Sequence, residues 1–394
     1  DYYQVDFLND SSVEDFIKYL KQKPIDILIN NAGINKIDEF DKIEAVDFDN
    51  IQKVNLKTPF LLCQAVIPYM KKNNFFTIAI PTKNRSSLLC ETLDNIILQK
   101  GFDQINVIIC DNSSNDDTVL VLQRYEKYSN IEIIYNTEPL SIDENMIKVA
   151  SYVESDYFLW LGDDDMLKEN QLQNLISIIK ENLSDFILLN ATLVSADLRT
   201  SFNNTMDIKS NIHYNSPKDF FNNHYSQTPF GTLIVKTELL RGSLSGVDKY
   251  NDTSHAYGGI VLDYLATKYQ KTKHVSILVI AHSYIMLRSV PKSWILESTQ
   301  IYFQHIPKYY DVLDSQYAPK SNEIKIDYIK KLFSFKYLIY YRFSTKINLF
   351  NFKANTLYAT PIMKLKYIFA VMIPRFNFIK KYLIARSDEK IKKF

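Results

Sequence analysis

The sequence predicts an α/β fold with a largely parallel sheet for the central part of the chain. From Phe75 to about residue 165, short apolar runs alternate with segments of helical periodicity. The first, second and fourth of these runs end at a proline or at a polar cluster, as expected of strands whose carboxyl ends meet at one edge of a sheet. The chain has 394 residues, which is enough for two or three domains.

Each element of this region follows from its residue pattern. The run 76–80 is apolar and stops at Pro81, because proline is unfavourable inside a central strand. The polar cluster 111–118 supplies a cap for the helix that follows it. In chain order, the pattern predicts strand 76–80, helix 88–98, strand 105–110, helix 119–128, strand 131–135, helix 143–154 and strand 157–161.

Three polar clusters follow the predicted strands and should converge on one crevice. They are residues 81–85, the pair Asp111 and Asn112, and the run 163–165, which consists of three Asp residues. An acidic side chain after the second strand can accept hydrogen bonds from a base or a ribose. Carboxylates after the fourth strand can hold Mg²⁺ or Mn²⁺ through their oxygens, and such an ion neutralises charge on a departing diphosphate. A solvated turn would explain an isolated Asp run, but here the run ends an apolar strand and two matching clusters precede it.

A resemblance to a known family rests on the order and spacing of three segments, 77–85, 108–118 and 160–165. On these residues, the region from 75 to about 290 resembles a family-2 glycosyltransferase of the GT-A fold, a Rossmann-like mixed sheet flanked by helices. The resemblance implies an inverting transfer from a nucleotide diphosphate sugar, with a UDP-sugar as the first choice, and a divalent metal, Mg²⁺ or Mn²⁺. It assigns the donor nucleotide to Pro81, Thr82, Asn84, Arg85, Asp111, Asn145 and Asp163.

The metal ligands are less clearly placed, because many members of this family have Asp where Gly162 stands. Either Asp163 and Asp165 form the D-x-D pair, or Asp164 is the main ligand and Gly162 replaces the first Asp. We expect Asp164 and Asp165 to lie closest to the metal.

An inverting transfer needs a base that takes the proton of the acceptor hydroxyl. The family often places an Asp in a downstream Glu-Asp pair, which this sequence lacks. The best candidates are Asp252 and His255, in a polar stretch after the apolar run around residues 233–235. A polar loop with a capping Asp is the competing interpretation. Asp263 lies in an apolar helical pattern and is a weaker candidate, and Arg288 is a further candidate for contact with the diphosphate.

Residues 1–74 resemble a different family. An apolar run at 25–29 predicts a strand, residues 30–33 read Asn-Asn-Ala-Gly, and a helical pattern from 48 to 70 contains Asn55. These features resemble the middle of a short-chain dehydrogenase/reductase, an incomplete Rossmann fragment. The glycine-rich dinucleotide loop and the catalytic Tyr-x-x-x-Lys of that family are not in the segment. We therefore expect no functional NAD(P) site and no independent oxidoreductase activity.

Residues 292–394 predict a helical, basic and aromatic C-terminal region. Lysine and arginine interleave with apolar residues, most densely in 351–394. Such segments can lie in a membrane interface beside anionic headgroups, whereas the alternative is a helical subdomain packed on the catalytic core. We therefore expect a cytoplasmic protein or one bound peripherally at the inner face of the cytoplasmic membrane.

Composition narrows the function. A formal net charge of +1 excludes a strong bias toward nucleic acid, so no nucleic-acid partner is expected. Three cysteines without metal-ligand spacing indicate reduced thiols. The resemblance to family-2 glycosyltransferases implies transfer of a sugar to a saccharide or lipid-linked acceptor, and we expect this in bacterial capsule, lipopolysaccharide or other cell-surface polysaccharide synthesis. The alternatives are a non-catalytic docking protein with a decayed site, and a nucleotidyltransferase, which the lack of glycine in residues 81–85 disfavours.

Overall fold

The computed structural model describes residues 2–21, 23, 25, 27–70, 75–224, 228–238, 244–289, 298–344 and 352–373. The chain forms two compact units, Asp1–Asn73 and Asn74–Phe394. The predicted division between 291 and 292 falls outside the described residues, so it stays a prediction.

The N-terminal unit consists mainly of helices. Helix α1 spans Asp10–Leu20, α2 spans Ala45–Gln52, and a π-helical turn, Lys53–Lys57, joins α2 to α3, Thr58–Met70. The predicted helix at 48–70 is therefore present and begins three residues earlier. The core of the unit is small, with Leu20, Leu62 and Val66 at its centre.

The prediction of a strand at residues 25–29 was wrong. The described residues of this run have no regular secondary structure, and Ile27 and Ile29 are 78% and 81% exposed. A strand needs a hydrogen-bonded neighbour, and the described part of this unit contains no strand that could pair with it. The Asn-Asn-Ala-Gly loop is nevertheless held in place, because the Asn55 side chain accepts from Ile34 N–H and donates to Ile34 C=O.

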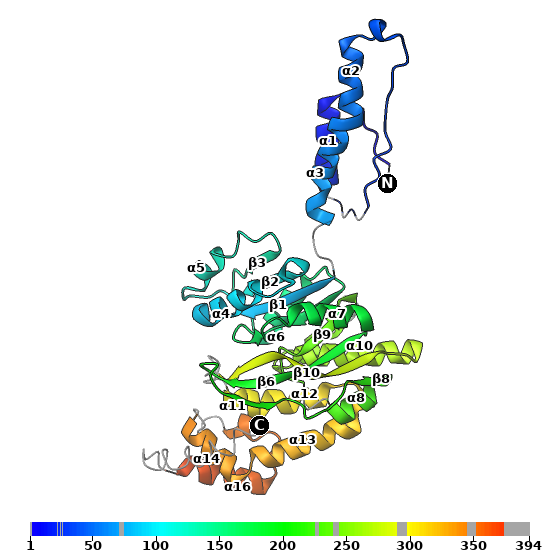
Figure 1. Ribbon diagram of the computed structural model, residues 1–394. Coiled ribbons are helices and arrows are strands. Elements are labelled where there is room, and N and C mark those ends of the chain that lie inside the picture. The colour runs from blue at the N-terminus through cyan, green and yellow to red at the C-terminus, as the bar shows by residue number, and fades with distance from the viewer. Residues whose placement is uncertain are drawn as a thin grey trace. The chain divides into compact units, whose positions relative to one another are not determined.

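The second unit is built on one mixed sheet (Figure 1). Its described strands follow the order β3-β2-β1-β4-β9-β6-β10-β5, with β7 paired to β6 and β8 paired to β10. The first four are parallel, and β9 pairs antiparallel with both β4 and β6. The strands are β1 Phe76–Thr82, β2 Asn106–Asp111, β3 Ile131–Tyr135, β4 Tyr157–Trp160, β5 Met166–Leu167, β6 Phe186–Ser195, β7 Ser201–Asn204, β8 Ile212–Tyr214, β9 Leu233–Lys236 and β10 Ile277–Ser289.

Pro81 lies within β1 and does not stop it, which corrects the predicted end of this strand. Asn112 N–H donates to Thr82 C=O on the β2 side, whereas Leu161 N–H donates to Ala79 C=O on the β4 side. Since alternate residues face alternate neighbours, the nitrogen of Pro81 faces the β4 side. Pairing with β4 has already ended there, at Ala79 and Trp160, so the missing N–H costs no ladder bond.

Helices cover both faces of the sheet, and each face has its own apolar core. Alternation along β4 shows the division, because Leu159 belongs to one core and Phe158 and Trp160 belong to the other. Helices α4 (Ser86–Ile97) and α7 (Leu172–Asn182) pack on the first face; α6 (Ile142–Ser151), α8 (Pro217–His224), α10 (Ala256–Thr272) and α12 (Ile306–Val312) pack on the second.

The described part of the C-terminal region, 298–344 and 352–373, is helical, as predicted (Figure 1). Its residues Tyr309 and Tyr317 join the core on the second face of the sheet, and a further core lies around Phe303 and Tyr367. Within the part of the chain that the structure describes, no helix has the length and apolar character needed to span a bilayer. Besides α12, the region contains α11 Ser298–Gln300, α13 Ala318–Leu332, α14 Phe335–Ser344, α15 Phe352–Asn355 and α16 Pro361–Met372.

Candidate functional site

The end of β1 and the segment after β2 are joined by side-chain bonds. Asn84 adopts a left-handed conformation, with φ 53°, and its N–H donates to Ser114 Oγ at 2.8 Å. Its Oδ1 accepts from Asn115 N–H at 2.8 Å. Pro81 pairs with Cys110 in the β1–β2 ladder. The predicted donor residues of β1 and β2 therefore lie at one edge of the sheet.

Asp111 ends β2 and is 2% exposed. Its carboxylate accepts from both the N–H and the hydroxyl of Ser114. The next residue, Asn112, accepts from Leu140 N–H at 2.7 Å and donates to Leu140 C=O at 2.8 Å. These bonds hold the Asp111–Asn112 turn against the segment that precedes α6.

Asn145 lies behind this turn in a buried amide network. Its Oδ1 accepts from Asn136 Nδ2 at 2.9 Å, and its Nδ2 donates to Cys110 C=O at 3.3 Å. Asn136 Nδ2 also reaches Asn112 Oδ1 at 3.2 Å. Asn145 is 4% exposed, so direct contact with a donor would require these bonds to break. Its geometry fits support of Asp111 and Asn112 better than the direct contact that the sequence suggested.

The three consecutive carboxylates after β4 have three different partners. Asp163 Oδ2 accepts from Thr82 Oγ1 at 2.8 Å. Asp164 Oδ2 accepts from Arg85 Nη1 at 3.1 Å, in an ion pair whose side chains are 10% (Arg85) and 7% (Asp164) exposed. Asp165 Oδ1 accepts from the backbone N–H of Arg288 at 3.0 Å. The acidic turn is thus tied to β1, to the start of α4 and to β10.

Gly162 has no room for a side chain. A Cβ placed there would lie 2.5 Å from Asp165 Oδ2 and 3.1 Å from Asp164 Oδ1. Gly231, with φ 91°, approaches Asp165 from another part of the chain. An ideal Cβ at Gly231 would lie 3.0 Å from Asp165 Oδ2. The carboxylates of Asp164 and Asp165 therefore converge over Gly162, and an Asp at position 162 would collide with them.

Thr92 was not predicted from the sequence, although it supports the acidic turn. The Thr92 hydroxyl, on α4, reaches the carbonyl oxygens of Asp163 and Asp165 at 3.1 Å and 3.0 Å. A lone Thr on an apolar helix face carries no sequence signal for this role.

Arg288, which the sequence offered for contact with the diphosphate, has a buried side chain with a partner of its own. It lies on β10, its side chain is 2% exposed, and its Nη2 donates to Glu91 Oε2 at 2.9 Å. Its role in the described geometry is to position Asp165 through its backbone N–H.

Asp252 and His255 lie in the loop before α10. Asp252 is exposed and left-handed, with φ 59°. The His255 ring packs against the rings of Tyr257 and Tyr309, with centroids 5.8 Å and 5.4 Å away. Burial lowers the pKa of His255, and its bond to the Thr253 backbone acts in the opposite direction. Tyr257 also contacts Trp160 of β4, with centroids 6.5 Å apart, which links the loop to the strand that leads into the acidic turn.

Asp263, the weaker candidate for the base, already has a partner, because its carboxylate pairs with Lys249 Nζ at 2.6 Å. It lies inside α10, two turns beyond the loop.

The acidic turn suits a hard divalent cation in its chemistry. Mg²⁺ in nucleotide sites takes one or two carboxylates and completes its shell with water and substrate phosphates. Asp164 and Asp165 could supply those carboxylates. Among the described residues, no group of three or more His, Cys, Asp or Glu side chains is arranged to hold an ion by itself, so phosphate oxygens would be needed.

Comparison with known proteins agrees with this geometry. Residues 77–241 match glycosyl transferase family 2, and residues 1–79 match the short chain dehydrogenase family. The chain is 31% identical over 118 residues to a poly(ribitol-phosphate) beta-glucosyltransferase of Bacillus spizizenii, covering 28% of this chain and 18% of that protein. It is 40% identical over 60 residues to a peroxisomal multifunctional enzyme type 2 of Drosophila melanogaster, covering 15% of this chain and 10% of that protein.

A solved structure shows the same fold. Residues 1–349 of S. aureus TarS, in a crystal structure in complex with UDP, superpose with a TM-score of 0.50 at 16% identity, covering 75% of this chain and 89% of that chain. The chain covers less than a fifth of each of the two curated relatives named above.

Proposed function

We propose that the chain, whose residues 77–241 match glycosyl transferase family 2, transfers a sugar, with inversion, from a nucleotide diphosphate donor to a saccharide or lipid-linked acceptor. The observation that carries this proposal is the convergence of the Asp164 and Asp165 carboxylates over Gly162, at the edge where β1, β2 and β4 end. Ligands of open α/β sheets bind at this edge.

The donor residues divide into two groups in this proposal. Asn84 and Asp111 recognise the nucleoside, and Pro81 and Thr82 lie beside them. Asn145 supports Asp111 and Asn112 through the buried amide network. Arg85 and Asp163 lie nearer to the diphosphate. Asp164 and Asp165 would hold Mg²⁺ or Mn²⁺, which when bound neutralises the charge of the departing diphosphate. UDP is the first nucleotide to test, because the TarS structure was solved with it.

His255 is a better base than Asp252. Its Nδ1 lies 3.3 Å from Thr253 C=O, and a carbonyl can only accept, so the proton belongs on Nδ1 and Nε2 carries the lone pair. Its lowered pKa keeps the ring neutral at pH 7. As the acceptor oxygen attacks the anomeric carbon, its proton passes to Nε2 and the bond from the anomeric carbon to the diphosphate breaks.

The acceptor belongs to cell-surface polysaccharide synthesis in this proposal. The Bacillus spizizenii relative is named for a poly(ribitol-phosphate) acceptor, so a polyol-phosphate polymer is the first acceptor to test.

Calorimetric titration of UDP, GDP and CDP, with and without Mn²⁺, tests the donor site directly. We expect one nucleotide to bind tightly and only with metal. Mass spectrometry then tests transfer to a poly(ribitol phosphate) oligomer. If folded protein binds no nucleotide under any metal condition, the chain is a docking protein with a decayed site.

Gly162→Ala should reduce transfer about a hundredfold, the loss that a displacement of about 1 Å can cause in a positioned group. The added Cβ would lie 2.5 Å from Asp165 Oδ2 and push that carboxylate aside. Gly33→Ala is a matched control, because its Cβ would meet no atom closer than 3.5 Å. Initial rates with saturating donor compare the two variants, and full activity in Gly162→Ala would show that the position of Asp165 is unimportant.

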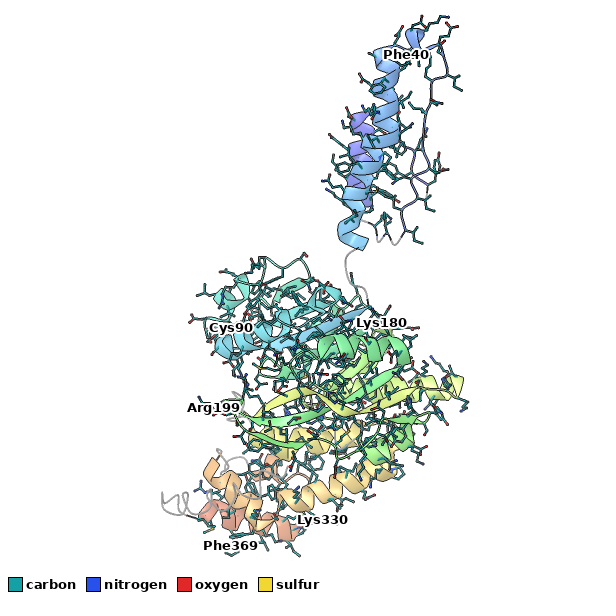
Figure 2. All side chains as sticks on the ribbon, in the orientation of Figure 1. Phe40, Cys90, Lys180, Arg199, Lys330 and Phe369 are labelled. Carbon is teal, nitrogen blue, oxygen red and sulfur yellow. The ribbon has the colours of Figure 1, made fainter. Side chains whose placement is uncertain are left out.

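Helix α16 carries the features expected for peripheral contact with an anionic membrane, which is part of this proposal. Four apolar residues recur at helical spacing along α16, and each is more than half exposed: Ile362, Leu365, Phe369 and Met372. Figure 2 shows Phe369 at the outer edge of the C-terminal helices. Residues 352–373 include three Lys and no Asp or Glu, which suits anionic headgroups. Of the predicted contact segment, 351–394, residue 351 and residues 374–394 lie outside the described residues.

Vesicle flotation tests this contact. We expect the full chain to float with phosphatidylglycerol vesicles and not with phosphatidylcholine vesicles. A Leu365→Gln, Phe369→Gln double variant should lower the bound fraction at least about tenfold, because burial of each apolar side chain contributes about 1.5–3 kcal/mol. Ile326→Gln is the control, because Ile326 is an exposed apolar residue on a different helix, α13. Equal flotation of the double variant and the control would remove the membrane contact from the proposal.

A further inference from the structure

The loop before α10 is held by one buried carboxylate on another helix. Asp143, in the first turn of α6, is 3% exposed. Its Oδ2 accepts from the backbone N–H of Thr253 at 3.2 Å and of Ser254 at 2.8 Å, and its Oδ1 accepts from the N–H of Ala256 at 3.1 Å. Both oxygens are thus committed to the backbone around His255. Hydrogen bonds to a buried carboxylate are among the stronger ones in proteins.

The loop needs such a clamp, because its backbone is strained. Asp252 and Ser254 both have left-handed backbones, with φ of 59° and 58°. Residues other than glycine adopt this conformation at a cost, and they keep it only where the surroundings hold them there. One of the three donors to Asp143 is the N–H of Ser254 itself. The other two belong to Thr253, which precedes Ser254, and to Ala256, which follows His255.

The same helix end also serves the nucleotide edge of the sheet. Asn145, two residues after Asp143, joins the amide network that reaches Asn112, next to Asp111. The first turn of α6 therefore contacts the proposed donor edge through one side chain and the proposed base loop through another. Its sequence carries a signal for this placement, since Ser141 and Glu144 form a capping box that begins the helix there.

We propose that Asp143 is a positioning residue that holds residues 252–256 in the one conformation in which His255 can accept the acceptor's proton. The inference rests on the proposed transferase function for its catalytic consequence, but the clamp itself can be measured without any activity. Asp143 touches neither donor nor acceptor in this assignment and acts only through the loop.

Asp143→Asn tests the clamp with little change in shape. An amide nitrogen cannot accept, so at least one of the three N–H donors loses its partner. We expect kcat to fall about a hundredfold, as for a displaced catalytic group, while the dissociation constant of the nucleotide diphosphate with Mn²⁺ stays within about twofold. Backbone amides of Thr253, Ser254 and Ala256 should exchange with deuterium about ten to a hundred times faster, the ratio expected for lost bonds to a charged acceptor.

Ser141→Ala is the matched control, because it weakens the same helix end without touching the loop. It removes the side-chain cap of α6, which accepts from Glu144 N–H, and it should leave kcat and the exchange of the three loop amides unchanged. If both variants lose kcat and nucleotide binding to the same extent, Asp143 is merely structural and the inference is wrong.

Hydrogen exchange also separates this inference from the proposed function. If the wild-type chain transfers no sugar, the proposed function fails, while protected loop amides that become exposed in Asp143→Asn still support the clamp. If the three amides are unprotected in the wild-type chain, no clamp exists, whatever the activity. This last measurement needs no variant, so it can overturn the inference even if Asp143→Asn does not fold.

Discussion

Replacing Asp164 and Asp165 together by Asn should abolish metal-dependent nucleotide binding and reduce turnover by at least about 10²–10³-fold, the range for loss of one preorganised group that stabilises developing charge. Asn keeps the shape of Asp and one acceptor oxygen, so Arg85 and the Arg288 N–H keep partners. The change removes the negative charge that would hold a divalent cation, and with the cation it removes the positive charge that would neutralise the departing diphosphate. Calorimetry with UDP, with and without Mn²⁺, measures the binding, and initial rates measure turnover.

Asp156→Asn is the control for this double variant. Asp156 precedes the same strand, at its opposite end, and is exposed. We expect it to bind nucleotide and metal like the wild-type chain. If the double variant retains wild-type binding in the presence of Mn²⁺, the acidic turn does not hold the metal, and a different set of carboxylates must be sought.

His255→Asn should lower kcat about 10²–10⁴-fold, the usual contribution of a positioned general base. The Asn amide can still donate to Thr253 C=O, as Nδ1 does, but nothing replaces Nε2. Burial places the folded-state pKa of His255 below 6.5, so the neutral, active form predominates above that value. In the wild-type chain kcat/KM should therefore fall as the pH drops below 6.5, and this acid limb should be missing in His255→Asn.

Asp252→Asn separates the two candidate bases. Because Asp252 is exposed and is not part of the clamp on the loop, we expect its kcat to stay within a few-fold of wild type. A large loss in Asp252→Asn together with an active His255→Asn would transfer the role of base to Asp252.

The same histidine affects stability in a stated direction. A folded-state pKa below the unfolded value means that the unfolded chain binds the proton more tightly. Burying the neutral His255 ring therefore adds no penalty to folding above the unfolded-state pKa, where the ring is neutral in both states. The free energy of unfolding falls as the pH drops from the unfolded-state pKa through the folded-state pKa, because the unfolded chain takes up the proton first. The wild-type chain should therefore lose more stability between pH 7 and pH 5 than His255→Asn does, in thermal unfolding at the two values.

Local patterns in the sequence were sufficient to place β1 to β4 and the acidic turn that follows β4. Strand β3 lies at the predicted residues, and β1, β2 and β4 differ from prediction by one or two residues, because runs of buried apolar residues bounded by polar clusters specify strands locally. Pro81 misled the prediction, since the cost of a proline depends on which neighbour its nitrogen faces. The run 25–29 misled it as well, because a strand requires a partner that no local pattern supplies.

What the sequence determined by itself is the match of residues 77–241 to glycosyl transferase family 2, the order of β1 to β4 along the chain and the residue types at the ends of these strands, because these depend on neighbours close in sequence. Only the tertiary structure decided the rest. It showed that Gly162 leaves no space beside Asp164 and Asp165, and that Asp143 holds a loop more than a hundred residues away. These relations depend on contacts between segments that are distant in the chain, and residue spacing carries no record of which distant backbone a buried carboxylate will meet.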